Sequence, residues 1–515
     1  MSTRGAAFAA ENRRVLLWVG RGHPRRLDGA CANCQLDLKA VTPDELGACA
    51  PIARAAVIEL PDSEDAVVWA APIIHEALDH GLAIALVMEE EAEGAAPHAP
   101  DPALYSRFYE RAKQLQEGSG GRVPAFYRDD GRVASWAMQW MPGPGENLTT
   151  LLSGEPLPDP GTARLFRRAF HDLSEVKLRR LSGGKSGAGV WRVEPATVDQ
   201  GKLSQPVVAK MHSIEKMRGE HSNYELIYAT VPFRVAAPLR RERSVEGFAN
   251  GLAVYDMVEK ALPLSSLLPA AVPAALIGSL FDHTLGRLHG GEGASEGSLA
   301  HAFGPGRLKA LRWSSELAQA AAVAQGRDSA VPGLAELRGC IEGFPSTPFQ
   351  RGMVHGDLHL GNLFVGWGSS EVIMIDYGSV LADAPVAADA ACLEVSVAFP
   401  SLTWDQVETA EQLPQLNEEW LRSTYRYPLT TSVPSRPDET WRADSIRAIR
   451  ANAFQRENDP RVYAFAVAAY LLRYSSFEGH APLAARVLAY ELAARLVCDA
   501  AGDKVAKSPP RGIRT

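Results

Sequence analysis

Polar residues follow two short apolar runs in the segment from Gly352 to Gly378. The segment begins GMVHGDLHLGNLFV and, after a short gap, ends EVIMIDYG. Buried strands do not carry carboxylates and amides at their ends unless those groups have a use. A β-hairpin formed by the two runs would place Asp376 beside Asn362, with Asp357 on the preceding loop. Because Mg²⁺ prefers amide and carboxylate oxygens, the sequence predicts a magnesium site at Asn362 and Asp376.

The same segment resembles the catalytic loop and metal-binding motif of the aminoglycoside phosphotransferase and choline kinase-like family, which has a protein-kinase-like fold. That family writes H-G-D-x-x-x-x-N and then often I-D-aromatic-G, and this chain has HGDLHLGN and IDYG. The resemblance implies that Asp357 orients or accepts the proton of an attacking hydroxyl, that Asn362 and Asp376 bind Mg²⁺, and that His355 shapes the loop. The alternative is a polar loop between two core strands, in which the aspartates only cap the ends of the backbone elements.

A glycine-rich segment lies between strands predicted over residues 177–181 and 190–193. Glycines let backbone N–H groups approach phosphate oxygens, so this turn is expected to cover the phosphates of ATP. The alternative is a flexible hairpin without a ligand. The predicted phosphate-binding residues are Gly183, Gly184, Ser186 and Gly187.

The letters GKS within that turn also suggest a Walker A motif. That motif needs a glycine at position 179, where this chain has Arg179. The flanking segments predict strand–turn–strand, whereas a Walker A loop opens a helix. We therefore exclude a P-loop.

An apolar strand over residues 206–210 ends in Lys210, and a buried lysine is costly unless an anion meets it. The strand resembles the V-A-I-K strand of the kinase template, whose Lys binds the α- and β-phosphates and is held by a Glu from the next helix. That helix offers Glu220 and Glu225. We favour Glu220 because it lies one turn before Tyr224 on the apolar face, and the alternative is that either Glu lies on a solvated face.

The chain after the predicted strand 251–258 is expected to cross between two lobes at residues 256–259, where the family pairs adenine with backbone groups. From Leu267 onward the composition turns helical. Part of this region forms a helical insertion before the catalytic loop. The predicted helices, beginning with the one that carries Glu220, are 217–229, 281–289, 308–324, 386–399, 405–423, 440–454, 462–474 and 482–500.

The first part of the chain alternates predicted strands and helices, which indicates a three-layer α/β domain around a parallel sheet. It resembles a receiver or flavodoxin-type module. Because Gly20, Arg21 and Gly22 stand where a receiver has acidic residues, we expect a partner-binding or regulatory role and no phosphoacceptor chemistry. The predicted strands are 15–19, 55–60 and 82–88, and the predicted helices are 63–80 and 103–116.

Four residues near the start of the chain have side chains that bind zinc: His23, Cys31, Cys34 and Cys49. A zinc site needs four such ligands, but this spacing matches no standard ribbon or finger. The other interpretation is ordinary thiols in a loop.

The predicted fold class is α+β: a bilobal protein-kinase-like fold with an antiparallel N-lobe sheet and a helical C-lobe, preceded by a small α/β domain with a parallel sheet. The segment 141–161 is rich in Pro and Gly and is predicted to be a linker. The predicted parts are the α/β domain 1–140, the linker 141–161, the N-lobe 162–260, the C-lobe 261–502 and a disordered tail 503–515.

Charge and composition exclude some classes of protein. The net charge of −8 gives no electrostatic reason to expect nucleic-acid binding. No apolar run reaches the length of a membrane span, and six cysteines in a chain this long do not indicate a disulfide framework. A cytoplasmic protein is expected.

The expected activity is Mg²⁺-dependent transfer of the γ-phosphate of ATP or GTP to a hydroxyl of a small molecule or a protein. The alternative is a nucleotide-binding pseudokinase scaffold within a multi-protein complex. The α/β domain joined to this kinase resembles the bacterial ternary complex associated type, which implies a protein partner for residues 1–140. An acidic cleft around Asp357 would indicate an amine-bearing acceptor, and an open groove would indicate a polypeptide.

Overall fold

A computed structural model provides the structure of the chain. The chain forms two compact units, Met1–Arg218 with Leu239–Met257, and Gly219–Pro238 with Val258–Thr515. Its fold class is α+β, with a parallel-sheet α/β domain followed in sequence by a mainly antiparallel sheet and a helix-rich region, as predicted. The structure describes residues 15–20, 25–50, 53–88, 102–119, 122–126, 130–139, 144–181, 189–195, 205–231, 236–258, 261–267, 274–290, 293–366, 372–399, 417–435, 440–477 and 481–502.

The α/β domain is built on a five-stranded parallel sheet in the order β2-β1-β3-β4-β5. This is the flavodoxin-like strand order. The three predicted strands are confirmed, whereas β2 and β5 were missed because β2 is mostly exposed and β5 has only two residues. The strands are β1 (Val15–Val19), β2 (Asp37–Ala40), β3 (Ala53–Leu60), β4 (Ala83–Met88) and β5 (Ala125–Phe126).

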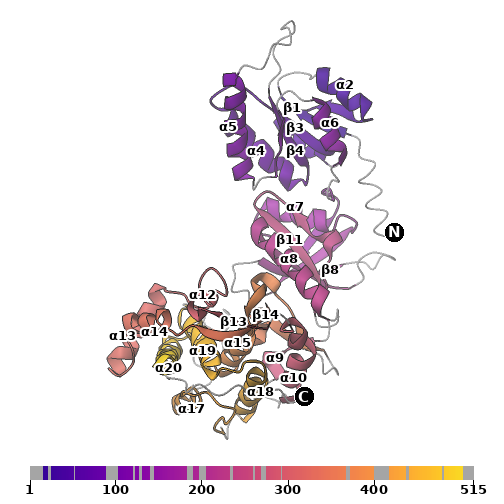
Figure 1. Ribbon diagram of the computed structural model, residues 1–515. Helices are drawn as coiled ribbons and strands as arrows, with labels where there is room; N and C mark the ends of the chain where they lie inside the picture. The colour runs from indigo at the N-terminus through magenta and orange to yellow at the C-terminus, as the bar shows by residue number, and fades with distance from the viewer. Residues whose placement is uncertain are drawn as a thin grey trace, which may run out of the picture. The chain divides into compact units, whose positions relative to one another are not determined.

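Helices cover both faces of this sheet (Figure 1). Because successive residues of a strand point to opposite faces, Leu17 packs with α4 and α5 while Leu16 and Trp18 pack with α2 and α6. Cys31 lies on α2, not on a loop, and is part of the second of these clusters. The helices are α2 (Arg25–Asn33), α3 (Leu46–Cys49), α4 (Ala66–Asp79), α5 (Pro102–Gly118) and α6 (Asp130–Gln139).

A six-stranded sheet in the order β10-β11-β9-β8-β7-β6 lies in the region predicted to be the N-lobe. It is antiparallel except that β6 runs parallel to β7, so part of the predicted linker 141–161 is a sheet strand. Helix α7 (Pro160–Ala169) starts where the side chain of Asp159 accepts a hydrogen bond from Thr162 N. The strands are β6 (Leu151–Gly154), β7 (Glu175–Arg180), β8 (Gly189–Pro195), β9 (Val207–Ser213), β10 (Val245–Glu246) and β11 (Asn250–Asp256).

A buried arginine joins the α/β domain to this sheet within the first unit. The guanidinium of Arg168, on α7, donates to the carbonyl oxygens of Asp79 (2.7 Å), Glu246 (2.8 Å) and Pro144 (3.1 Å). Gly81 has φ +76°, and a Cβ there would lie 2.2 Å from Arg168 Nη2, so no larger residue fits. One cation therefore satisfies carbonyls from three separate segments.

The second unit contains two antiparallel three-stranded sheets. The strand order is β12-β15-β16 in one and β13-β14-β17 in the other. The predicted pairing of the two apolar runs is confirmed, because β15 and β16 form an antiparallel pair. The strands are β12 (Ala261–Pro263), β13 (Gly293–Gly297), β14 (Thr347–Val354), β15 (Leu363–Gly366), β16 (Val372–Met374) and β17 (Leu381–Pro385).

Helices make up most of the remaining described residues of the second unit, as predicted, while residues 405–416 of the helix predicted over 405–423 lie outside the described residues. The helix expected over residues 308–324 begins later, because Lys309 has φ +55° and Ser314 caps α13 by accepting from Leu317 N. Helix α8 (Ile214–Thr230) starts in the first unit of the chain and ends in the second. The other helices are α9 (Leu264–Leu267), α10 (Ala274–Ser279), a π-helical turn (Leu280–Leu285), α11 (Gly286–Leu288), α12 (Leu299–Ala302), α13 (Ser315–Arg327), α14 (Leu334–Glu342), α15 (Ala387–Ala398), α17 (Glu418–Thr424), α18 (Thr440–Arg456), α19 (Pro460–Ser475) and α20 (Leu483–Gly502).

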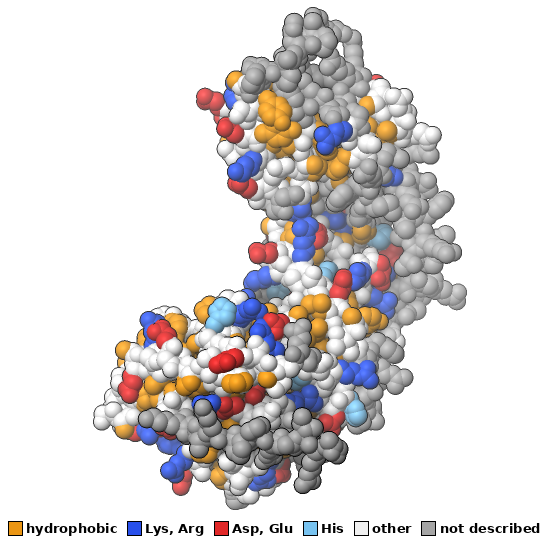
Figure 2. Space-filling model, viewed as in Figure 1, with side chains coloured by type: hydrophobic (Ala, Val, Ile, Leu, Met, Phe, Trp, Pro, Cys, Tyr) orange, Lys and Arg blue, Asp and Glu red, His pale blue; other side chains and the backbone are white. Residues whose placement is uncertain are grey.

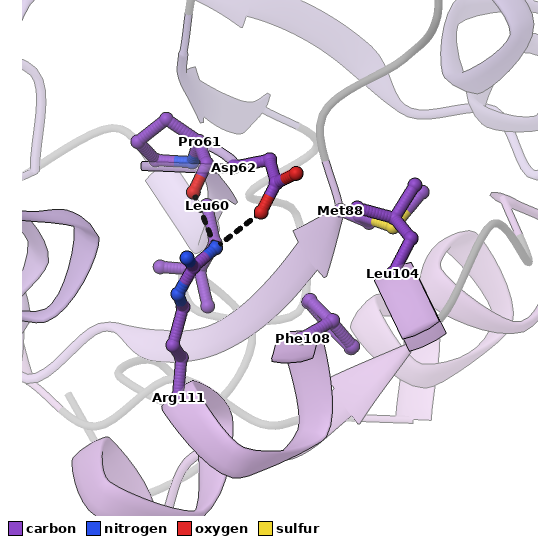
Figure 3. Close-up of a pocket in the computed structure, with 7 residues that line it drawn as sticks. All are labelled: Leu60, Pro61, Asp62, Met88, Leu104, Phe108 and Arg111. Atoms are coloured by element: carbon purple, nitrogen blue, oxygen red, sulfur yellow. Dashed lines mark hydrogen bonds and ion pairs between the residues drawn. The ribbon is translucent and has the colours of Figure 1, made fainter. Parts of the chain in front are cut away.

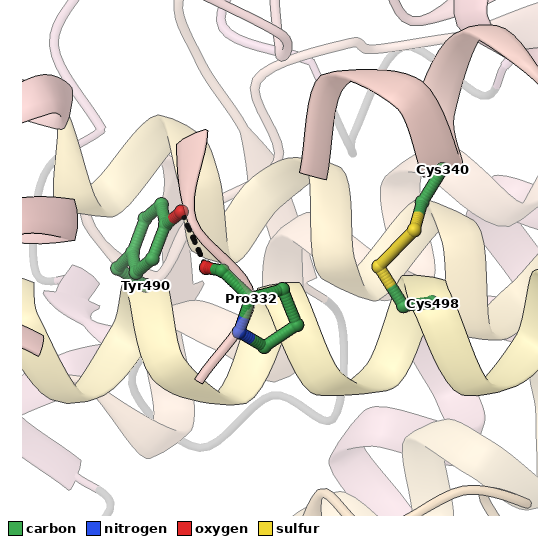
Figure 4. Close-up of a disulfide and its surroundings, with 4 residues drawn as sticks. All are labelled: Pro332, Cys340, Tyr490 and Cys498. Carbon is green, nitrogen blue, oxygen red and sulfur yellow. Dashed lines mark hydrogen bonds between the residues drawn. A yellow bond between two sulfur atoms is a disulfide. The ribbon is translucent and has the colours of Figure 1, made fainter. Parts of the chain in front are cut away.

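A disulfide between Cys340 and Cys498 joins α14 to α20 (Figure 4). The same two regions are joined by a hydrogen bond from Tyr490 Oη to the carbonyl of Pro332, 2.9 Å long. The composition did not lead us to expect a cross-link, since six cysteines in a chain this long indicated no disulfide framework. The bond anchors the helical segment before the catalytic loop to the last helix.

Charged side chains of both signs are interspersed on the face of the molecule in Figure 2. Within the described ranges, no helix combines the length and the apolar composition needed to cross a membrane.

Candidate active site

The loop HGD depends on a glycine in the left-handed region. Gly356 has φ +75°, and a Cβ at this position would lie 2.3 Å from the backbone oxygen of Ser379. A side chain is therefore excluded both by backbone conformation and by space. This explains locally why glycine stands between His355 and Asp357.

A buried carboxylate fixes the backbone of the same loop. Asp389, in the first turn of α15, accepts hydrogen bonds from His355 N and Gly356 N, each 2.9 Å long. His289 Nε2 lies 3.1 Å from Asp389, and Tyr470 Oη donates to Gly356 O at 3.0 Å. Asp389 and Tyr470 thus hold the backbone of the loop, and His289 contacts Asp389.

His355 links the loop to the strand that precedes Asp376. The side chain is fully buried, and its Nε2 lies 2.9 Å from the carbonyl oxygen of Ile375. Its ring also lies 6.0 Å from that of Tyr377, so His355 joins the loop to the turn after Asp376, and its role in shaping the loop stays a prediction.

Asn362 and Asp376 lie together at the end of the β15–β16 hairpin. Ile375 N donates to Asn362 O at 3.0 Å, directly before Asp376. Asn362 Nδ2 donates to Asp357 O at 2.9 Å, which leaves the amide Oδ1 for a cation. Asp376 has φ +65°, an uncommon conformation that is concentrated at functional sites.

These donors fit Mg²⁺ and not a softer metal, because both are hard oxygens. Among the residues that the structure describes, no group of three or more His, Cys, Asp and Glu side chains could hold a metal ion. A pair of protein oxygens is typical for Mg²⁺, which usually keeps water and substrate phosphates as its other ligands.

Asp357 forms an ion pair with Arg473 of α19, with 2.9 Å between Oδ1 and Nη1. Burial by itself would raise the pKa of Asp357, but Arg473, with smaller contributions from His359 and His355, outweighs it and lowers the pKa below its ordinary value. The carboxylate is therefore ionised at neutral pH, as an acceptor for a hydroxyl proton must be.

The two glutamates considered for the lysine partner differ in burial. Glu220 is 3% exposed, whereas Glu225 is exposed. Four residues after Glu220, Tyr224 packs edge-on against Tyr377 at 5.7 Å, and Asn223 Nδ2 donates to Tyr377 O at 2.9 Å. The face of α8 that carries Glu220 is thus the face that packs near the Asp376 turn, which favours Glu220 over Glu225.

Lys210 lies in the first unit, in the middle of the N-lobe sheet. On β9 it pairs with Val190 of β8 and Ala253 of β11, and its side chain is 8% exposed. A lysine this buried needs an anionic partner. The placement is the one expected for a phosphate-binding lysine.

The predicted phosphate-binding turn, with Gly183, Gly184, Ser186 and Gly187, lies outside the described residues. The strands on either side of it are described: β7 and β8 are antiparallel, and Leu181 N donates to Val190 O at 2.8 Å. This strand–turn–strand arrangement confirms the exclusion of a P-loop.

The zinc hypothesis gains no support from the described residues. Cys31 packs in the α2–α6 core, and Cys49 Sγ accepts a hydrogen bond from Lys39 Nζ at 3.1 Å. The side chain of His23 lies outside the described residues. None of the described ranges contains a cluster of metal-binding side chains here.

The α/β domain has a small cavity at the carboxyl edge of its sheet, between the ends of β3 and β4 and helix α5 (Figure 3). Arg111 Nη1 is 2.7 Å from Asp62 Oδ1 and closes one side. At about 10 Å³ the cavity holds one water molecule at most. It offers no ligand site in this conformation.

Sequence reasoning missed several residues that build the site. His289 ends the predicted helix 281–289, to which no role was assigned, and it contacts Asp389. Arg473 and Tyr470 were seen only as members of a predicted helix. No local signal marks these residues, because each reaches the loop from a distant part of the chain.

Residues 177–429 match the sequence model of the phosphotransferase enzyme family. No curated protein matches the chain. Similar solved structures include an aminoglycoside phosphotransferase of Streptomyces rimosus, with 17% identity over 53% of this chain and 93% of that chain and a TM-score of 0.28. An aminoglycoside-3'-phosphotransferase of type VIII has 16% identity over 54% of this chain and 94% of that chain, with a TM-score of 0.29.

A gentamicin complex of a further aminoglycoside phosphotransferase has 11% identity over 62% of this chain and 89% of that chain, with a TM-score of 0.32. The segment that matches the family contains HGDLHLGN, IDYG, Lys210 and Glu220. This part of the chain therefore has the sequence features of the phosphotransferase enzyme family.

Proposed function

We propose that the protein is a kinase that transfers the γ-phosphate of ATP, or GTP, to the hydroxyl of a small molecule, with Mg²⁺ as cofactor. The observation that carries this proposal is the convergence of Asp357, Asn362 and Asp376 on one rigid loop and one hairpin. The match to the phosphotransferase enzyme family supports it.

Each residue has a role in this proposal. Asp357 accepts the hydroxyl proton as the acceptor oxygen attacks the γ-phosphorus and the bond to the departing ADP breaks. Asn362 and Asp376 hold Mg²⁺, which neutralises phosphate charge when bound. Lys210 binds the α- and β-phosphates with Glu220 as its carboxylate, and the turn containing Gly183, Gly184, Ser186 and Gly187 covers them.

ADP release from ATP and Mg²⁺ tests the proposal. Asp357→Asn should lower kcat by about 10²–10⁴-fold, because a positioned proton acceptor contributes that much. Asp376→Asn should abolish the Mg²⁺ dependence of nucleotide binding measured by calorimetry. Glu419→Gln, which changes an exposed acid on α17, is the control and should behave as wild type.

A pseudokinase scaffold is the second candidate, and the ion pair between Asp357 and Arg473 favours it, since one oxygen of the carboxylate is already engaged. In that case wild type and Asp357→Asn would both bind ATP with Mg²⁺ and neither would release ADP. Turnover that depends on Asp357 would exclude the scaffold.

We also propose that the α/β domain, residues 1–140, binds a protein partner in a complex of the bacterial ternary complex associated type. Helices cover both faces of its sheet, and its cavity holds no ligand-sized space. Cross-linking of the full chain in cells, read by mass spectrometry, should give intermolecular links concentrated on this domain. Links confined to the kinase-like region would contradict the assignment.

A further inference from the structure

The side of Asp357 that faces α19 is positively charged. Arg473 Nη1 lies 2.9 Å from the Oδ1 of this carboxylate. The side chains of Asp357 and Arg473 are 23% and 13% exposed. A cationic amine would therefore approach this side of Asp357 against the charge of Arg473.

A second arginine adds to this charge. Arg312 lies before α13, where its Nε donates to Lys309 O at 3.0 Å. Burial lowers the pKa of Arg312, and the charge of Arg473 lowers it further, while Asp357 acts in the opposite direction. Arg312 thus lies near enough to Asp357 and Arg473 for both charges to act on it, and within the described ranges it makes no ion pair of its own.

Arg473 has unused hydrogen-bonding capacity. Within the described part of the chain its single ion pair is the one between Nη1 and Asp357, and its buried Nε has no hydrogen-bond partner. The rings of Tyr470 and Phe477, each 5.8 Å from the guanidinium carbon, hold the group in place. Guanidinium groups bind carboxylates and phosphates through paired N–H donors, so an anion is the ligand that suits this side chain.

We propose that the acceptor is a small alcohol that carries a carboxylate or phosphate group, which Arg473 and Arg312 bind while Asp357 receives the hydroxyl proton. This proposal rests on the proposed kinase function and specifies its substrate class. When the anion binds Arg473 in place of Asp357, the Oδ1 of Asp357 becomes available to the hydroxyl. The hydroxyl oxygen then bonds to the γ-phosphorus, ADP leaves, and the proton passes to Asp357.

A set of matched diols tests the charge of the acceptor. Glycerol 3-phosphate and glyceric acid are anionic, glycerol is neutral, and 3-amino-1,2-propanediol is cationic. All four compounds carry hydroxyl groups on two adjacent carbons. With wild-type protein, ATP and Mg²⁺, we expect at least one anionic compound to increase ADP release about tenfold or more over glycerol, in line with a charge-assisted contact. The phosphorylated product is identified by mass spectrometry, and the two anions distinguish phosphate from carboxylate recognition.

Substitution of the two arginines tests whether they bind the anionic group of the acceptor. Arg312→Gln and Arg473→Gln should each raise KM for the stimulating anion by about tenfold, as expected for the loss of one charged hydrogen bond, with a smaller effect on KM for ATP. A merely structural arginine would change both constants or the fold, which circular dichroism monitors. Arg327→Gln, on the exposed end of α13, is the matched control and should leave all values unchanged.

Two results would overturn the inference and leave the proposed function standing. One is ADP release stimulated by 3-amino-1,2-propanediol or streptomycin but by neither anion. The other is ADP release that depends on Asp357 but responds to none of the compounds. If wild type binds ATP and releases no ADP in any reaction, the proposed function fails as well, and the substrate assignment fails with it.

Discussion

Single residues decide the shape of the catalytic loop. Gly356 supplies a backbone conformation that other residues adopt only under strain, and Asp389 fixes two successive N–H groups of the loop. Asp376 accepts a left-handed conformation without being glycine. At this scale the site is built by backbone constraints, and the catalytic side chains follow from them.

Gly356→Ala should lower the free energy of unfolding by about 2–4 kcal/mol, the combined scale of a strained backbone and an overpacked contact. The added methyl group would press on the backbone oxygen of Ser379, which cannot rotate away. Urea unfolding measures the change. Gly339→Ala, in helix α14 where a Cβ meets nothing within 4 Å, should be neutral or stabilising.

The ion pair between Asp357 and Arg473 predicts a pH dependence. The pKa of Asp357 is lower in the folded protein than in the unfolded chain. The stability that the ionised carboxylate contributes is therefore fully present above the pKa of the unfolded chain and is lost as the pH falls through the pKa of the folded protein. In Arg473→Gln the lowering effect of the arginine is lost, so burial should raise the pKa of Asp357. The acid limb of the kcat/KM profile should then move to higher pH. An acid limb at the same pH in wild type and variant would show that Asp357 does not set it.

Whole elements bring the side chains of the site together. The β15–β16 hairpin places Asn362 beside the residue that precedes Asp376, and α15 and α19 each contribute one charged group to the loop. Helix α8 presents one face to Tyr377, through Asn223 and Tyr224. The orientation of this helix decides which glutamate is buried.

Glu220→Gln should raise KM for ATP by about tenfold. The substitution would remove the carboxylate proposed to hold the phosphate-binding lysine, and the loss of one hydrogen bond between charged groups has an effect of this size. The matched change Glu225→Gln alters an exposed residue of the same helix and should leave KM within twofold, roughly the scatter of surface substitutions. Steady-state kinetics at saturating Mg²⁺ compares the two. The reverse order of effects would assign the role to Glu225.

At the scale of the molecule, the α/β domain and the N-lobe sheet belong to one unit of the chain. Arg168 connects them by donating to three backbone carbonyls, and burial lowers its pKa to about 10. Phe248 N donates to Asp79 Oδ1 at 2.7 Å across the same junction. The domain is therefore integral to the first unit and not an appendage on a free linker.

Arg168→Leu should lower the free energy of unfolding by about 3–5 kcal/mol, because it leaves several buried carbonyls without donors. Arg167→Leu changes the neighbouring residue, whose side chain is 32% exposed, and should cost less than about 1 kcal/mol. Thermal and urea unfolding of the full chain compare the two. Equal losses would mean that the junction contributes little.

The sequence by itself determined the local parts of this protein. The alternation of apolar and polar residues identified the strands around the glycine-rich turn, the strand of Lys210 and the hairpin of Asn362 and Asp376, because side-chain periodicity follows directly from backbone geometry. Short or exposed strands such as β2 and β6 were missed, since they carry too few apolar residues to form a pattern.

Only the tertiary structure decided what surrounds those parts. Arg473 and Tyr470 reach the catalytic loop from α19, and His289 contacts Asp389 from a part of the chain 100 residues earlier. The burial that separates Glu220 from Glu225 and the arginine beside Asp357 also depend on which helix faces pack together. Spacing along the chain records local geometry, whereas these contacts arise from packing between distant segments, which no local pattern encodes.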